Sequence, residues 1–477
     1  MARSHDVKEL GTESPLRLIG RLAVPTVCAN MVTSLYSMVD RLFIGQFVGG
    51  TTLAAVGLIA PLNNVTAACT VMLSVGGGAM IATAFGAQDA DRANTAFTNI
   101  VTLSLIMAAA VSGIFIALAP QLCVLCGGEE GSDLVALAST FLRITSIGTL
   151  FQVINVGFAS MIRSEGNTTY AMFVTMIGAV INVGLNALTI IVLGMGLLGS
   201  AWSTVISSSI SATLSASYFR RGHGAAKWAG WSAVHPATMG KVCAMGIAPA
   251  IFQVLSFANN IFINRSLVGC ATAELGSDGR TIVLAANSVI STVESVATMF
   301  IMGVNNAVST VLSFNNGAKK YDRVFSAAVI GQVLATTAAL VLWLVWRLLP
   351  GPVFSAFVGD DQRIIDVGIR AVTIGKLFVF GLGFQTLASM YFSALGRPQT
   401  ATLISVSRNG LFLIPALLVL PGMLGLDGVY ASTSVSDACS LVLVAFIYLR
   451  DLKRLKGLAQ AQAQGQETQA PSQTSAS

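Results

Sequence analysis

The stretch Leu35-Tyr36-Ser37-Met38-Val39-Asp40-Arg41-Leu42-Phe43-Ile44-Gly45 places an acid inside the first long apolar segment of the chain. In a helix that spans a membrane, a buried carboxylate costs about 3 kcal/mol even on lenient insertion scales. That cost is usually tolerated where the acid lies on an ion or substrate path. The stretch therefore predicts a functional acid at Asp40, provided that the segment around it crosses a membrane.

The composition of the chain indicates a membrane protein. Hydrophobic residues make up 54% of the sequence and charged residues 10%, with a mean hydropathy of +0.76. Soluble domains carry about 25% charged residues, so this chain has too few charges to cover a water-facing surface. A lipid-embedded backbone must satisfy its own hydrogen bonds, as helices or a closed barrel do. Because the apolar runs are long and do not alternate, we predict an all-α polytopic membrane protein.

Twelve apolar segments are long enough to cross about 30 Å of hydrocarbon as helices. Pro25, Pro61, Pro249 and Pro415 lie inside four of them and should bend them. The predicted spans cover residues 20–45, 53–84, 94–119, 134–160, 169–193, 197–219, 241–268, 281–312, 324–348, 364–394, 400–420 and 427–449.

The distribution of Lys and Arg predicts the orientation of these spans. Most basic residues fall in one set of loops, whereas the opposite loops are rich in Asp and Glu. By the positive-inside rule, both termini are expected in the cytoplasm of a bacterial cell, with the protein in the plasma (inner) membrane. The net charge of +6 is then a topology signal, and we predict no nucleic-acid surface.

The chain also contains an internal duplication. Three motifs recur at separations of 231, 233 and 229 residues. The pairs are Gly86–Arg92 with Gly317–Arg323, Phe151-Gln152 with Phe384-Gln385, and Gly196–Thr204 with Gly425–Thr433. Two six-span copies predict two pseudo-symmetric lobes with a central cavity between them. The expected parts are a cytoplasmic segment 1–15, an N-terminal lobe 16–219, an inter-lobe loop 220–240, a C-terminal lobe 241–450 and a disordered cytoplasmic tail 451–477.

Several charged residues lie inside predicted spans, and four of them are candidate functional groups because intramembrane charges are functional by default. These four are Asp40, Glu294, Arg408 and Asp437. For Asp40 the alternative is a pair with Arg41 that reaches the outer interface. Arg408 and Asp437 could instead form a structural ion pair between neighbouring helices.

Two further patterns have structural interpretations. Asp366 and Arg370 are four residues apart near the start of a span, which favours an i,i+4 pair. Cys123 and Cys126 follow the third span, where either a disulfide or two packed thiols is possible.

Several chemistries find no support in the sequence. The three histidines lie in polar segments, so neither a metal site nor a Ser-His-Asp triad is indicated. The segment Gly368–Lys376 misses the spacing of a phosphate-binding loop. We therefore expect no enzyme activity, no cofactor and no ATP-driven motor.

The order of these motifs resembles the MATE family, the multidrug and toxic compound extrusion transporters. The resemblance rests on Val39-Asp40 followed by Leu53–Leu58, on the duplicated Gly-Ala-x-x-x-Asp-Arg loops, and on the segments 305–321 and 408–415. The last two segments are similar to a MepA-like bacterial branch. The resemblance covers about residues 16–450.

This resemblance implies an antiporter in which proton or sodium entry drives export of lipophilic, often cationic, drugs and toxic compounds by alternating access. A single two-lobed chain can form such a path as a monomer. The family's N-lobe cation site falls on Asp40, Asn182 and Asn186, with a Thr at Thr204. Because Asn186 replaces an acid, Asp40 would carry the titratable charge of that lobe alone.

The family pattern also covers part of the C-terminal lobe. The acid that another branch carries in span seven is Gln253 here. Arg408 and Asp437 match residues of the MepA-like branch, whereas Glu294 is not assigned to a position of the pattern. All three charged residues are expected to line the cavity.

Two other functions are alternatives to export for a chain of this class. A lipid-linked precursor flippase of a related superfamily would need a strongly cationic cavity for phosphates. This chain mixes acids with its intramembrane arginines, which favours drug export. A membrane enzyme or receptor would need a catalytic constellation or an added soluble domain, and the sequence shows neither.

Overall fold

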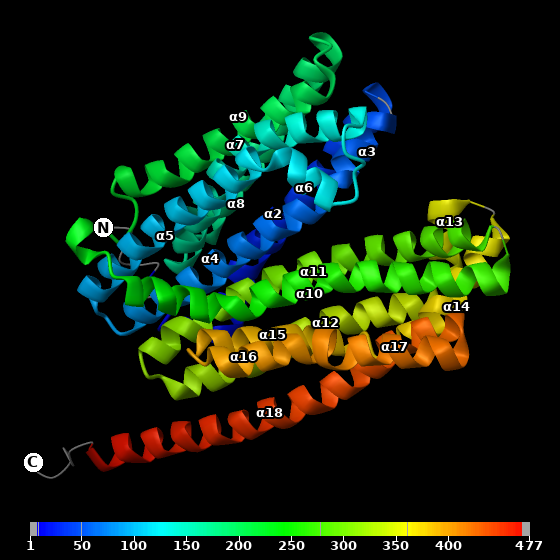
Figure 1. Ribbon diagram of the computed structural model, residues 1–477. Helices are drawn as coiled ribbons and strands as arrows, with labels where there is room; N and C mark the ends of the chain where they lie inside the picture. Colours follow the sequence, from blue (N-terminus) through cyan, green and yellow to red (C-terminus); the bar gives the residue numbers. More distant parts are fainter. Residues whose placement is uncertain (1–6, 8, 49, 277, 360, 470–477) are drawn as a thin grey trace, which may run out of the picture.

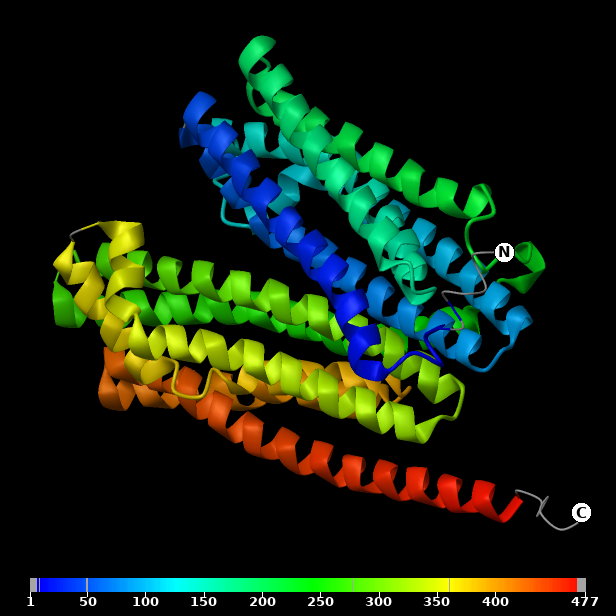
Figure 2. The same ribbon diagram turned by 180° about the vertical axis from the view of Figure 1, so that it is seen from behind.

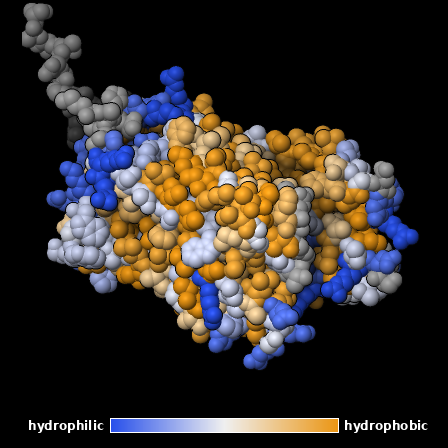
Figure 3. Space-filling view, turned by 90° about the horizontal axis from the view of Figure 1, so that it is seen from above, coloured by the Kyte–Doolittle hydropathy of each residue, from blue (hydrophilic) through white to orange (hydrophobic). Residues whose placement is uncertain are grey.

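The computed structural model describes residues 7, 9–48, 50–276, 278–359 and 361–469, and these residues form helices joined by short loops. The helices lie in two groups, seen from opposite sides in Figures 1 and 2. Hydrophobic residues cover a broad central area of the face in Figure 3, with hydrophilic residues mainly toward its edges. Such a surface suits a lipid environment, as the composition predicts.

The first group, called the N half, runs from α2 to α9. Its helices are α2 (Pro15–Phe47), α3 (Gly50–Leu58), α4 (Ala60–Gly86), α5 (Ala90–Ala117), α6 (Ala119–Leu125), α7 (Asp133–Ser164), α8 (Thr168–Asn186) and α9 (Gly196–Arg220), with a π-helical turn Ala187–Val192 after α8.

The second group, called the C half, runs from α10 to α18, after a short 3₁₀ turn Trp231–Ala233. Its helices are α10 (Pro236–Leu275), α11 (Gly279–Gly317), α12 (Tyr321–Leu348), α13 (Pro350–Val358), α14 (Gln362–Gly375), α15 (Gly381–Ala394), α16 (Pro398–Val406), α17 (Leu413–Leu424) and α18 (Leu426–Gln469), with a π-helical turn Ser407–Phe412 between α16 and α17.

Every predicted span coincides with helical structure. Ten helical segments among the described residues are long and apolar enough to cross a membrane. The other two predicted spans are α9 and the α14–α15 pair, which is interrupted at residues 376–380. The second span is also divided, because α3 ends at Leu58 and Pro61 lies in the first turn of α4.

The structure differs from the prediction of a disordered tail from residue 451. Helix α18 continues without a break to Gln469. The segment is rich in Ala, Gln, Leu and Lys, all strong helix formers, so the polar composition does not prevent a helix. Residues 470–477 lie outside the described part of the chain.

The two halves approach each other most closely near the ends of α4 and α11, which we call the closed end. Glycines make this approach possible: a Cβ on Gly86 would lie 1.8 Å from the carbonyl oxygen of Phe314, and one on Gly317 would lie 2.0 Å from that of Thr83. From there the two groups diverge toward α3 and α13, at what we call the open end (Figures 1 and 2).

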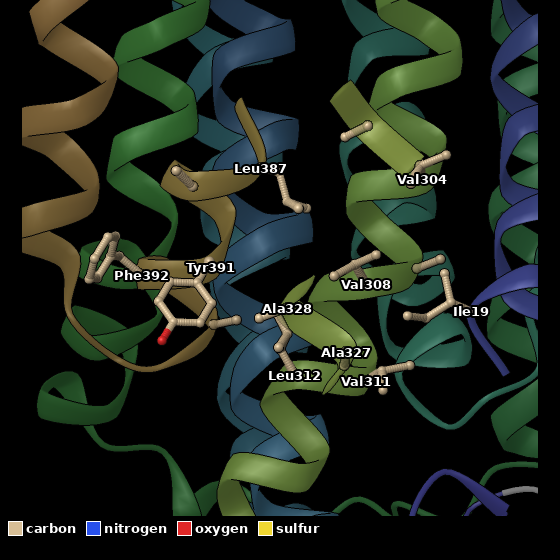
Figure 4. Close-up of a cluster of buried hydrophobic side chains, with 14 of the residues drawn as sticks. Ile19, Val304, Val308, Val311, Leu312, Ala327, Ala328, Leu387, Tyr391 and Phe392 are labelled. Carbon is tan, nitrogen blue, oxygen red and sulfur yellow. The ribbon is translucent and has the colours of Figure 1, made fainter. Parts of the chain in front are cut away.

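A buried cluster joins the halves at the closed end. Ile19 of α2 packs with Val308 and Val311 of α11, and the same cluster continues to Tyr391 and Phe392 of α15 (Figure 4). The segment before α2 strengthens this contact, because Arg323 and Lys320 of the C half donate hydrogen bonds to its backbone carbonyls. The closed end therefore combines close backbone contact, apolar packing and hydrogen bonds.

Candidate functional site

Asp40 lies toward the open end of α2 and is bound by side chains of two other helices. Its Oδ1 accepts hydrogen bonds from Asn186 Nδ2 at 2.7 Å and from Ser200 Oγ at 2.9 Å. Asn186 is fully buried at the end of α8, directly before the π-helical turn. π-Helical turns often mark functional sites, so the local geometry agrees with a role for this contact. The alternative pair with Arg41 involves a side chain outside the described residues.

A chain of polar side chains continues from Asp40 along α8. Asn186 Nδ2 also donates to Asn182 Oδ1 at 3.2 Å, and Asn182 Nδ2 donates to Ser207 Oγ at 3.2 Å. The spacing of four residues puts both asparagines on one face of α8. Thr204 lies nearby on α9, where its hydroxyl donates to the carbonyl of Ser200 at 3.1 Å. The structure thus brings together the four N-lobe residues named from the sequence.

Asn182 and Thr204 line a cavity of about 390 Å³, which we call the N-half cavity. Asp40 and Asn186 do not line this cavity. They lie beside the part of it nearest the open end, because Asn186 is one helical turn beyond Asn182 and binds Asp40. The lining is mostly polar and uncharged, with hydroxyl and amide groups from α2, α7, α8 and α9. The acid therefore lies next to the space that a solute could occupy.

The C half holds its intramembrane charges as ion pairs. Arg408 Nε lies 2.6 Å from Asp437 Oδ1, and Lys376 Nζ lies 2.6 Å from Glu294 Oε1. Asp437 is almost fully buried, whereas Glu294 keeps about a quarter of its side chain exposed. The Arg408–Asp437 pair predicted as the structural alternative is therefore present.

These pairs line a second cavity of about 600 Å³, the C-half cavity, which also includes Gln253. Asn30, Val71, Ser74 and Asn306 line both cavities, so the two spaces adjoin between the halves. A second π-helical turn carries Arg408, and Ser436 Oγ donates to the backbone carbonyl of that residue. Glu294, Arg408 and Asp437 thus all line this cavity.

Two features of the site differ from the sequence interpretation. Lys376 was not among the predicted site residues, yet it is the partner of Glu294 and stands where α14 ends. Only its place inside an apolar run could have indicated it. The predicted Asp366–Arg370 pair is wrong, because Arg370 instead binds Glu274 and Asp427, each at 2.6 Å. Two carboxylates from α10 and α18 compete successfully with one neighbour on the same helix.

The described residues contain no group of three or more His, Cys, Asp and Glu side chains that could hold a metal ion. Cys123 and Cys126 are free thiols, and Cys123 is buried in an apolar cluster. Of the two alternatives for this motif, the structure therefore supports packed thiols.

Comparison with known proteins agrees with this architecture. The sequence model of the MatE family matches residues 25–188 and 271–418. The multidrug export protein MepA of Staphylococcus haemolyticus is 23% identical over 432 residues, covering 89% of this chain and 91% of the relative. MepA of Staphylococcus aureus strain N315 is 20% identical over 435 residues, covering 90% and 92%.

Solved structures share the fold. A crystal structure of MATE in the bent conformation has a TM-score of 0.86 at 21% identity, covering 95% of this chain and 99% of the other. A MOP superfamily transporter from Pyrococcus furiosus, described as having a binding pocket of reverse polarity that suggests a different function, has a TM-score of 0.84 at 21% identity, covering 94% and 98%. The predicted fold class, an all-helical polytopic membrane protein, is thus confirmed. On the family match over most of its length, the chain belongs to the MatE family of membrane transporters and is not an enzyme.

Proposed function

We propose that this transporter is a cation-coupled antiporter that exports lipophilic, often cationic, compounds by alternating access. Entry of a proton or a sodium ion would drive the exchange, and one chain would suffice for transport. The closed end, which carries the basic loops, would face the cytoplasm together with both termini. The printed names of the staphylococcal relatives, multidrug export proteins, support this choice of solute.

The observation that carries the proposal is the contact of Asp40 with Asn186 and Ser200 beside the N-half cavity. An ionised Asp40 attracts a cationic solute or a coupling cation, and protonation removes that attraction. If the contacts of Asp40 differ between the two access states, then binding of a cation shifts the equilibrium between them. A single titratable acid is sufficient for this exchange.

The charges of the C-half cavity support export of drugs over flipping of lipid-linked phosphates. Arg408 and Lys376 each lie in an ion pair with an acid. A phosphate would have to compete with Asp437 or Glu294 for these cations. The flippase alternative predicts a strongly cationic cavity, which this pairing does not provide.

Accumulation of ethidium in cells that express the protein tests the proposal. Wild-type cells should accumulate less dye than cells without the protein, and collapse of the proton or sodium gradient should abolish the difference. Asp40→Asn should raise accumulation to the level of cells without the protein. Asp366→Asn is the matched control, because Asp366 lies on α14 and accepts a hydrogen bond from Gln362 away from both cavities. Full export by Asp40→Asn would refute the role of this acid, and export indifferent to both gradients would refute cation coupling.

A further inference from the structure

The N-half cavity contains a charged group that the proposed exchange does not use. Arg163, in the last turn of α7, lines this cavity near the closed end. Its Nη2 donates a hydrogen bond to Ser74 Oγ at 3.0 Å. Among the described residues no carboxylate forms an ion pair with it, and no Asp, Glu or Lys side chain lines the N-half cavity.

The acid nearest in sequence to Arg163 is engaged elsewhere. Glu165 Oε1 accepts hydrogen bonds from the backbone N–H groups of Ala225 and Ala226, both at 3.0 Å. A guanidinium stays charged at all ordinary pH values, and charges away from bulk water are normally paired. Arg163 therefore faces the cavity as a cation whose protein contact is a neutral hydroxyl.

A neutral amide lies in the same part of the cavity as this guanidinium. Arg163, Ser74 and Asn306 also line one small pocket together, and the Asn306 side chain forms no hydrogen bond with the described residues. Thr168, at the N-terminus of α8, also lines the N-half cavity and adds the positive end of a helix dipole. A guanidinium and an amide N–H that line one pocket suit an anion with two acceptor oxygens.

The duplication shows that this arrangement is specific to the N half. Arg163 corresponds to Ser393 of the C half, because each accepts a backbone hydrogen bond from the glycine that follows its helix, Gly166 after α7 and Gly396 after α15. The C half thus has a hydroxyl where the N half has a cation.

We propose that Arg163, with Asn306, binds the carboxylate of transported lipophilic solutes. Asp40 and Arg163 lie near opposite ends of α8, a helix about 27 Å long. The cavity is therefore polarised, with an anion-binding end near the closed end of the molecule and an acid beside the other. This inference rests on the proposed export function in one respect, namely that the bound carboxylate belongs to a solute that the protein transports.

Binding of dansylglycine and of dansylglycinamide to the purified full-length protein tests the proposal, because the two probes differ in charge and share the fluorophore. Fluorescence titration without an ion gradient should show at least about tenfold tighter binding of the acid by wild type. Arg163→Gln should weaken binding of the acid about tenfold and change binding of the amide by less than about twofold. Arg163→Lys should keep part of the preference, since it keeps the charge without the planar fork.

Arg143→Gln is the matched control, because Arg143 is an exposed residue of the same helix that lines neither cavity. It should leave both affinities unchanged. The proposal is overturned if wild type shows no preference for the acid, or if Arg163→Gln weakens binding of both probes equally. If the protein prefers the acid but shows no gradient-driven export, the antiport proposal fails and the anion site stands. If it shows gradient-driven export but no preference for the acid, the anion site fails and the antiport proposal stands.

Discussion

The two halves of this transporter hold their acids in different ways. In the N half, Asp40 accepts hydrogen bonds from an amide and a hydroxyl. In the C half, Asp437 and Glu294 each contact a cation at 2.6 Å. A hydroxyl can donate to a carboxylate or accept from a carboxylic acid, whereas a guanidinium can only donate. The contacts seen in the N half therefore fit both charge states of the acid, and those in the C half fit only the ionised state.

The asymmetry assigns different tasks to the two acids. Asn186 Oδ1 is buried and has no hydrogen-bond partner among the described residues, so the same amide offers an acceptor for a protonated Asp40. Protonation of Asp437 would instead leave Arg408 without its anion inside the protein, which is costly. We infer that exchange of the coupling cation takes place at Asp40, while the C-half pairs maintain the shape of the larger cavity.

The largest expected effect is on stability and comes from breaking the more buried ion pair. Asp437→Asn should lower the free energy of unfolding by about 3 kcal/mol, because it leaves the Arg408 guanidinium buried and unpaired. The double variant Asp437→Asn/Arg408→Gln should regain most of that loss. Thermal unfolding of the purified protein measures both, with Asp366→Asn as a surface control expected to change stability by less than about 0.5 kcal/mol. Equal stabilities of the single and double variants would contradict the assigned role of the pair.

A smaller effect is expected when Asp40 loses one of its donors. Asn186→Ala removes the 2.7 Å hydrogen bond and leaves the contact with Ser200. A hydrogen bond to a charged group contributes about 1.5 kcal/mol, so export should fall by roughly tenfold. Initial rates of ethidium efflux from loaded cells provide the measurement. Asn94→Ala serves as control, since Asn94 accepts from the Lys227 N–H far from both cavities, and its export should stay near that of wild type.

Glu294→Gln should have a weaker effect on stability than Asp437→Asn. The carboxylate of Glu294 is partly exposed to the C-half cavity, so water can solvate Lys376 after the charge is lost. We expect a loss of about 1 kcal/mol, between the values for surface and buried pairs. If Glu294→Gln destabilised the protein more than Asp437→Asn in the same unfolding assay, exposure would not explain the difference between the two pairs.

A last effect, on the pH dependence of stability, concerns an acid outside the membrane. Burial raises the pKa of Glu165 to about 7 from its ordinary value of 4.5, although hydrogen bonds from the Ala226 and Ala225 N–H groups oppose the shift. Because the folded state holds this proton more tightly than the unfolded state, the contribution is complete below about pH 4.5 and is lost as the pH rises to about 7.

Comparison of unfolding of wild type and Glu165→Gln across this range should therefore show wild type losing stability relative to the variant as the pH rises. Parallel pH profiles of the two proteins would mean that Glu165 ionises normally in the folded state. The result would show directly whether a buried acid whose partners are the Ala225 and Ala226 N–H groups titrates near neutral pH.

Much of the fold follows from local sequence properties. Hydrophobic length predicts the spans, and repeated motifs at a nearly constant offset predict two copies of one unit. Asp40 could be identified because an acid inside an apolar run is costly wherever the run lies. Arg408 and Asp437 lie on consecutive spans, so their pairing was a reasonable expectation before the structure.

Other features depend on tertiary contacts that local patterns do not contain. Lys376 and Glu294 are separated by 82 residues, and they meet only because α14 ends beside α11. Arg370 forms ion pairs with Glu274 and Asp427, which lie on helices distant in sequence, and not with the nearby Asp366. The charge at one end of the N-half cavity could not be predicted either. The sequence pattern assigns Arg163 to a cytoplasmic loop, whereas in the structure it lines the cavity.

The most direct test of the assigned roles is the number of cations that the purified protein releases when it binds a solute. Calorimetric titration with ethidium in buffers of different ionisation enthalpy counts protons, and ²²Na⁺ equilibrium binding counts sodium ions. Wild type and the double variant Asp437→Asn/Arg408→Gln should each release close to one cation per ethidium, whereas Asp40→Asn should release close to none. Undiminished release by Asp40→Asn, or loss of release in the double variant alone, would contradict the assignment of cation exchange to Asp40.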